Sequence, residues 1–199
     1  MNERDLRFFA KAEDKPKLKA QFHEEIYKGL ALGEADFLKI PELIEQGIVH
    51  TIANDFVSLS EYLNIPLPRI GLTKHWNDNT PQEQGSYDIR DVLAAASVDE
   101  QYPEGIVVYS PFYLKRYVSY KMGIEQEIDS PPLPLSQLNG HEGLHLYQYR
   151  YNKKAWIKHA LILKEQGFSA FSETQTEKDA MEFEKKWLEI VYNPVYEIK

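Results

Sequence analysis

The chain has 199 residues, of which 43% are hydrophobic and 27% charged, with a net charge of −8 at pH 7. This length and composition suit a single globular domain with a proper core and exclude wholesale disorder. The acidic balance argues against a nucleic-acid partner, and the absence of cysteine excludes disulfides and thiolate metal ligands.

Residues 1–68 are predicted to form an N-terminal helical region packed on the rest of the domain. Residues 2–32 have a helical pattern, and a second helix opens with Pro41 in its first turn and runs to a stop near Pro66. The first residues lack the apolar segment of a signal peptide, and no stretch is apolar enough to span a membrane. We therefore expect a cytoplasmic protein without a membrane partner.

Residues 69–199 are predicted to form the core that carries the function. Its first part, residues 69–86, is rich in loop-forming residues and is expected to hold short strands. The apolar runs 92–98 and 105–110 are joined by a polar segment that contains a proline, which indicates a β-hairpin.

Helices are expected after this hairpin. One begins at Ser110-Pro111, and the next follows the stiff connector SPPLPL. Two more cover about residues 153–166 and 174–190, where apolar residues recur at spacings of three and four. Helices, then a small antiparallel or mixed sheet, then further helices predict an α+β fold and not an alternating α/β one.

The helix after the connector carries HEGLHLYQYR, in which His141, Glu142 and His145 have the spacing H-E-x-x-H. Histidines four residues apart lie on one helix face and can both bind one zinc ion at about 2.0–2.1 Å. Zinc lowers the pKa of a water that it binds to roughly 7, and a neighbouring carboxylate can take the proton. Chance gives this pattern only about 0.02 times in a chain of this composition.

A catalytic zinc site needs a third protein ligand. The acidic residues near the start of the segment 174–187 are the candidates, namely Glu173, Glu177 and Asp179. Helical periodicity does not decide between Glu177 and Asp179. Acidic residues in the first turn of a helix also favour its dipole without binding a metal, so a helix without metal is a second interpretation.

HEGLHLYQ followed by TEKDAMEF resembles the zincin metallopeptidases, specifically the gluzincin-like group, over residues from about 85 to 190. The resemblance implies that His141, His145 and Glu177 bind Zn²⁺ and that Glu142 is the general base. It also implies a zincin-like core in which the hairpin supplies a small sheet, whose edge strand can hold an extended peptide. The expected function is hydrolysis of a peptide bond in a peptide or protein substrate.

The chain departs from the gluzincin pattern at Met181, where the family usually has an aspartate that orients a histidine ligand. Asp179 could take that role or be the third ligand itself. The metzincin pattern is excluded because Tyr151 stands where a third histidine is required. An alternative function is a catalytically idle, metal-binding zincin fold that acts as a partner-binding or regulatory module. A helical interaction protein without metal is a third interpretation.

Two further polar residues invite a role. Gln148 lies on the same helix face as His145 and could hydrogen-bond it, although an ordinary buried or rim glutamine is the favoured interpretation. His159 could stabilise an oxyanion, but a surface position is the favoured expectation.

Overall fold

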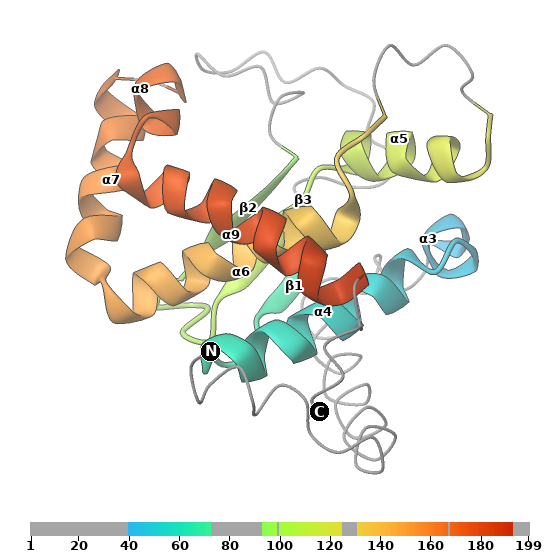
Figure 1. Ribbon diagram of the computed structural model, residues 1–199, viewed down its shortest axis with the longest axis horizontal. Coiled ribbons are helices and arrows are strands. Elements are labelled where there is room, and N and C mark those ends of the chain that lie inside the picture. Colours follow the sequence, from blue (N-terminus) through green and yellow to red (C-terminus); the bar gives the residue numbers. More distant parts are fainter. Residues whose placement is uncertain (1–39, 73–92, 99, 125–130, 167, 193–199) are drawn as a thin grey trace.

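Figure 1 shows the computed structural model of the chain, which describes residues 40–72, 93–98, 100–124, 131–166 and 168–192. These residues form mostly helices together with one small sheet, which confirms the α+β fold. The helical pattern predicted over residues 2–32 lies outside the described residues. No described helix is both long enough and apolar enough to cross a membrane.

The helix predicted from Pro41 onward is present as two helices, α3 (Pro41–Glu45) and α4 (Ile48–Leu63). The break falls at Gly47, whose φ of 69° lies in the left-handed region that glycine adopts at little cost. Asn64 also takes a left-handed conformation, with φ 55°, and ends α4 two residues before the predicted proline stop.

The sheet has three strands, β1 (Arg69–Leu72), β2 (Ala94–Ser97) and β3 (Ile106–Tyr109), in the order β1-β3-β2. Strands β2 and β3 pair antiparallel, which confirms the predicted hairpin, and β1 pairs parallel to β3. Within the described part of the chain, β2 is an edge strand with one side open to a further strand.

The remaining helices follow the predicted order, with one short addition between the last two. They are α5 (Pro111–Lys121), α6 (Leu135–Tyr151), α7 (Lys153–Gln166), α8 (Phe168–Ser172) and α9 (Gln175–Tyr192). Helix α6 lies at the centre, where it packs against α4, α9, α7 and β2 (Figure 1). Because it is covered on several sides, α6 buries polar residues as well as apolar ones and has no single apolar stripe.

Helices α6 and α9 approach closely at Gly140. A Cβ added to Gly140 would lie 2.8 Å from Trp187 Cβ and 2.9 Å from its Cγ, and Trp187 is fully buried. We expect Gly140→Ala to destabilise the protein by about 1–3 kcal/mol in urea unfolding, because the clash outweighs the gain of roughly 1 kcal/mol in helix propensity.

Gly143→Ala is the matched control for this prediction. Its Cβ would meet Leu59 Cδ1 at 3.0 Å, and a terminal methyl group can move more easily than the Cβ of a buried tryptophan. We expect the free energy of unfolding of Gly143→Ala to stay within about 1 kcal/mol of the wild type. A Gly140→Ala protein as stable as the wild type would show that close packing does not fix the α6–α9 contact.

A series of buried side-chain hydrogen bonds connects α4, α6 and the sheet. Asn139 Nδ2 donates to Asp55 Oδ2 at 2.6 Å, and the Tyr109 hydroxyl donates to Asn139 Oδ1 at 2.5 Å. Burial raises the pKa of Asp55 from 3.8 to about 6, although hydrogen bonds from Asn139 and Ser136 oppose the rise. The ionised form of this carboxyl is therefore disfavoured inside the fold.

The raised pKa of Asp55 predicts a pH-dependent stability. Its contribution is fully present below pH 3.8 and is lost as the pH rises through about 6, a difference of about 3 kcal/mol. Asp55→Asn removes the charge and can keep both hydrogen bonds, so we expect it to stabilise the protein by about 2–3 kcal/mol more at pH 7.5 than at pH 4. Urea unfolding of both proteins at each pH measures this, and a difference that does not change with pH would contradict it.

Candidate metal centre

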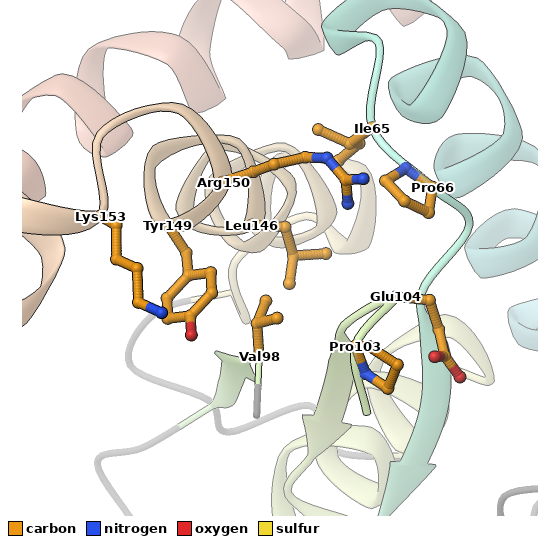
Figure 2. A pocket seen from close by; sticks show the side chains of 9 residues that line it. All are labelled: Ile65, Pro66, Val98, Pro103, Glu104, Leu146, Tyr149, Arg150 and Lys153. Carbon is orange, nitrogen blue, oxygen red and sulfur yellow. The ribbon is translucent and has the colours of Figure 1, made fainter. Parts of the chain in front are cut away.

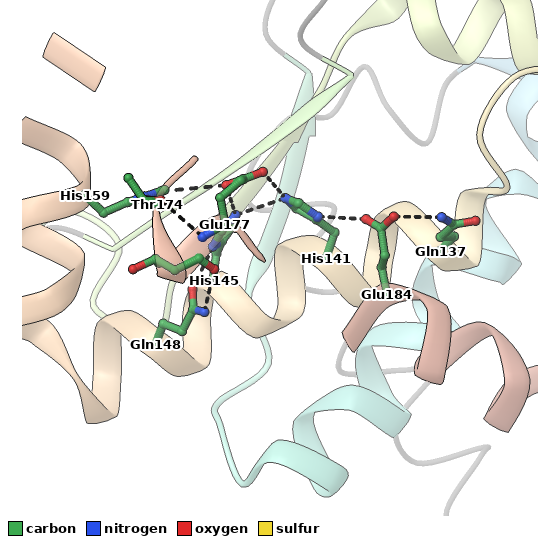
Figure 3. Close-up of polar contacts among 9 residues, drawn as sticks. Gln137, His141, His145, Gln148, His159, Thr174, Glu177 and Glu184 are labelled. Atoms are coloured by element: carbon green, nitrogen blue, oxygen red, sulfur yellow. Dashed lines mark hydrogen bonds and ion pairs between the residues drawn. The ribbon is translucent and has the colours of Figure 1, made fainter. Parts of the chain in front are cut away.

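Helices α6 and α9 bring three of the predicted site residues together (Figure 3). His141 Nε2 lies 3.0 Å from His145 Nε2 and 3.0 Å from Glu177 Oε1, and His145 Nε2 lies 3.3 Å from Glu177 Oε2. One potential ligand atom from each residue falls within 4.8 Å of the others. Glu177 and His145 are buried and His141 is nearly so, which shields the group from bulk water.

The rotation of α9 about its axis decides which acidic residue faces the histidines. The buried residues of α9 recur at helical spacing along one face: Glu177, Ala180, Glu184 and Trp187. Asp179 is exposed and accepts a hydrogen bond from Gln175 at 2.7 Å. Glu173 is exposed and pairs with Lys178 at 2.9 Å. Of the three candidates for the third ligand, only Glu177 is placed at the histidines.

Glu184 orients His141 and was missed in the sequence. His141 Nδ1 donates to Glu184 Oε2 at 2.8 Å, and Gln137 Nε2 donates to Glu184 Oε1 at 2.7 Å (Figure 3). Glu184 thus makes the contact with a histidine that the gluzincin-like pattern assigns to an aspartate at position 181, where this chain has methionine, and for which Asp179 was the candidate. Its position seven residues after Glu177, two helical turns along the same face, is the signal that could have found it.

Gln148 orients the second histidine. His145 Nδ1 donates to Gln148 Oε1 at 2.8 Å, while Gln148 Nε2 donates to the carbonyl oxygen of Thr176 at 2.9 Å. Because its amide nitrogen is engaged with a carbonyl, the oxygen of Gln148 must be the atom that faces the imidazole. The favoured expectation of an ordinary buried or rim glutamine was therefore wrong.

These partners fix the tautomers of both imidazoles. Each Nδ1 donates to an oxygen, so each neutral ring presents the lone pair of its Nε2. The two Nε2 atoms lie 3.0 Å apart beside a carboxylate oxygen, with their lone pairs facing each other. These lone pairs repel each other and the carboxylate unless a cation or a proton lies between them. Two imidazole nitrogens and a carboxylate are a donor set that suits zinc and can also hold iron or manganese.

The charges of the group reflect the same geometry. Burial by itself lowers the pKa of His141, but its contacts with Glu177 and Glu184 outweigh burial and raise that pKa to about 10. Burial raises the pKa of Glu177, but its contacts with His141 and His145 outweigh this and lower it to about 2. These shifts favour an imidazolium against a carboxylate, and a divalent cation that binds here would replace that proton.

Glu142 lies on the side of α6 that faces the sheet. Its carboxylate is buried, and the backbone N–H of Ala96 in the edge strand β2 hydrogen-bonds it. Burial raises the pKa of Glu142, with the nearby charges of His145 and His141 acting in the opposite direction. A buried carboxylate with a raised pKa beside two histidines is suited to accepting and returning a proton.

His159 on α7 was expected at the surface, and this expectation was wrong. Only 2% of the residue is exposed, and its Nδ1 forms a 2.8 Å hydrogen bond with the Thr174 hydroxyl. Burial lowers its pKa to about 4, so the ring is neutral near pH 7. Its Nε2 lies 3.9 Å from Glu177 Oε2, and neither atom has a hydrogen-bond partner among the described residues. These orphaned buried atoms are consistent with a site that takes a further occupant.

None of the family models, curated proteins or solved structures compared with the chain matches it. The fold class and the site geometry therefore stand on the described residues alone.

Proposed function

We propose that the protein is a zinc-dependent metallopeptidase with a zincin-like core. The ion would be held by the Nε2 atoms of His141 and His145 and by the carboxylate of Glu177. The observation that carries the proposal is the convergence of these three ligand groups beside the buried carboxylate of Glu142. The edge strand β2, whose backbone reaches that carboxylate, supports an extended peptide as substrate.

Bound zinc would supply a Lewis acid that polarises the substrate carbonyl and acidifies water. The Glu142 carboxylate accepts the proton of the attacking water and can return it to the nitrogen of the leaving amine. The N–H of Ala96 holds this carboxylate in place during both transfers. Glu184 and Gln148 keep the two imidazoles in the tautomer that presents Nε2.

The idle-module alternative receives less support from the site. The sequence feature that spoke for it was the missing aspartate at position 181. Glu184 makes the contact with a histidine that this aspartate would make. A site without catalysis also has no need for a buried carboxylate at Glu142, which costs stability when it is ionised.

The test is incubation of the zinc-loaded protein with a mixture of peptides of varied sequence, followed by mass spectrometry of the products. Glu142→Gln, loaded with zinc in the same way, serves as the blank. We expect new peptide termini only in the wild-type sample. The proposal fails if no product forms or if both samples give the same products.

A further inference from the structure

A pocket of about 160 Å³ lies at the end of the edge strand β2, outside the metal centre (Figure 2). Val98, which follows β2, and Leu146 and Tyr149 of α6 contribute to its apolar part, together with Ile65, Pro66 and Pro103. This volume is large enough for one side chain and too small for a folded partner. The pocket therefore suits a single residue of an extended chain.

The charged residues around the pocket are mostly positive. Arg150 and Lys153 both line it and are exposed, and Lys153 Nζ lies 5.4 Å from the centre of the Tyr149 ring. The acidic residue that lines the pocket, Glu104, is neutralised by Arg69 at 2.6 Å. Arg150 makes no hydrogen bond or ion pair within the described part of the chain, so its guanidinium is available to a ligand.

The pocket is close to the catalytic residues along two elements. Val98 is two residues beyond Ala96, which contacts Glu142, and a strand advances about 7 Å over two residues. Tyr149 is one helical turn beyond His145, about 6 Å along α6. An extended peptide on the open edge of β2, with Glu142 at the bond to be cleaved, would place a side chain within about two residues of that bond in the pocket.

We propose that this pocket binds a carboxylate of the substrate peptide, so that the enzyme prefers peptides with an acidic group within about two residues of the cleaved bond. This inference rests on the proposed function, because the pocket is a substrate-binding pocket only if the neighbouring site cleaves peptides. It adds the substrate class: the carboxylate meets Arg150 and Lys153, while the apolar part of the residue packs on Val98, Leu146 and Tyr149. Charge-assisted hydrogen bonds to a guanidinium supply the selectivity.

Two sources can supply such a carboxylate, an aspartate or glutamate side chain and the C-terminus of the peptide. Their chemistry at Arg150 and Lys153 is the same. Fluorescent peptides with an internal glutamate and an amidated end, and peptides with a free C-terminus and no acidic side chain, separate the two. For each, the isosteric control replaces the carboxylate with an amide.

The experiment measures binding of these peptides by fluorescence anisotropy to the zinc-loaded Glu142→Gln protein, so that hydrolysis does not interfere. We expect at least one carboxylate peptide to bind about tenfold more tightly than its amide counterpart. Arg150→Ala combined with Lys153→Ala should remove this preference. Lys154→Ala, which removes a neighbouring exposed cation that does not line the pocket, should keep it.

A charge reversal guards against an uninformative loss of binding. Arg150→Glu should weaken binding of the glutamate peptide and strengthen binding of a lysine peptide. A damaged fold could not produce both effects. Equal binding of carboxylate and amide peptides, including no binding of either, would overturn the proposal, as would a preference that survives the double substitution. A carboxylate preference without hydrolysis by the wild type would instead contradict the proposed peptidase function, while the carboxylate-binding role of the pocket would be kept.

Discussion

Replacing Glu142 with glutamine is expected to lower the rate of peptide hydrolysis about 10²- to 10⁴-fold while the protein keeps its zinc. Glutamine has the shape of glutamate, and its side-chain oxygen can still accept the hydrogen bond from the backbone of Ala96. It cannot accept a proton from water at neutral pH. The loss should therefore appear in kcat, with little change in KM, because substrate binding does not depend on this proton transfer.

The control for this prediction is metal analysis of the same samples. Equal zinc content in the two proteins assigns the loss to the proton transfer and not to a damaged site. A Glu142→Gln protein that hydrolyses peptides at the wild-type rate would show that another group is the base, and would remove Glu142 from the mechanism.

The purified protein is expected to bind about one zinc per chain, and His145→Ala is expected to lose it, because two ligands are too few to hold the ion. Zinc bound to the native state should also stabilise the fold. Free zinc at 1,000 times its Kd adds about 4 kcal/mol, and a chelator should reverse this gain. Elemental analysis and thermal unfolding with and without chelator measure both effects.

Two carboxylates on the same helix provide the sharpest control for the metal prediction. Glu177→Gln should lose zinc, whereas Asp179→Asn should keep it, because Glu177 is buried at the histidines and Asp179 is exposed. Glu184→Ala should weaken zinc binding about 10- to 100-fold, as expected when a residue that orients a ligand is removed. Zinc retained in Glu177→Gln and lost in Asp179→Asn would reverse the assignment of the third ligand.

Local sequence patterns were sufficient to predict most of the described helices and strands. The hairpin, the helix that begins at Pro111 and the last two long helices are where the sequence pattern predicted them. The pattern failed at Gly47, because the apolar spacing continues across the break and only the left-handed backbone of a glycine reveals it. It also failed for Gln148, because α6 is covered from several sides and buries polar residues without leaving an apolar stripe as a signal. It failed for His159 because that ring is covered by a residue outside its own helix, Phe171 of α8, with 4.0 Å between the ring centroids.

Local spacing is enough to place His141 and His145 on one helix face with Glu142 next to them, since helix geometry fixes how residues one to four positions apart are arranged. The choice between Glu177 and Asp179 required the packing of α9 against α6. Their side chains point in different directions from α9, so the choice depends on how that helix is rotated against α6. Trp187, packed on Gly140, and the buried Ala180 set this rotation, and the same rotation carries Glu184 to His141. A contact between helices distant in the chain leaves no trace in local spacing, which is why spacing alone leaves both Glu177 and Asp179 as candidates for the third ligand.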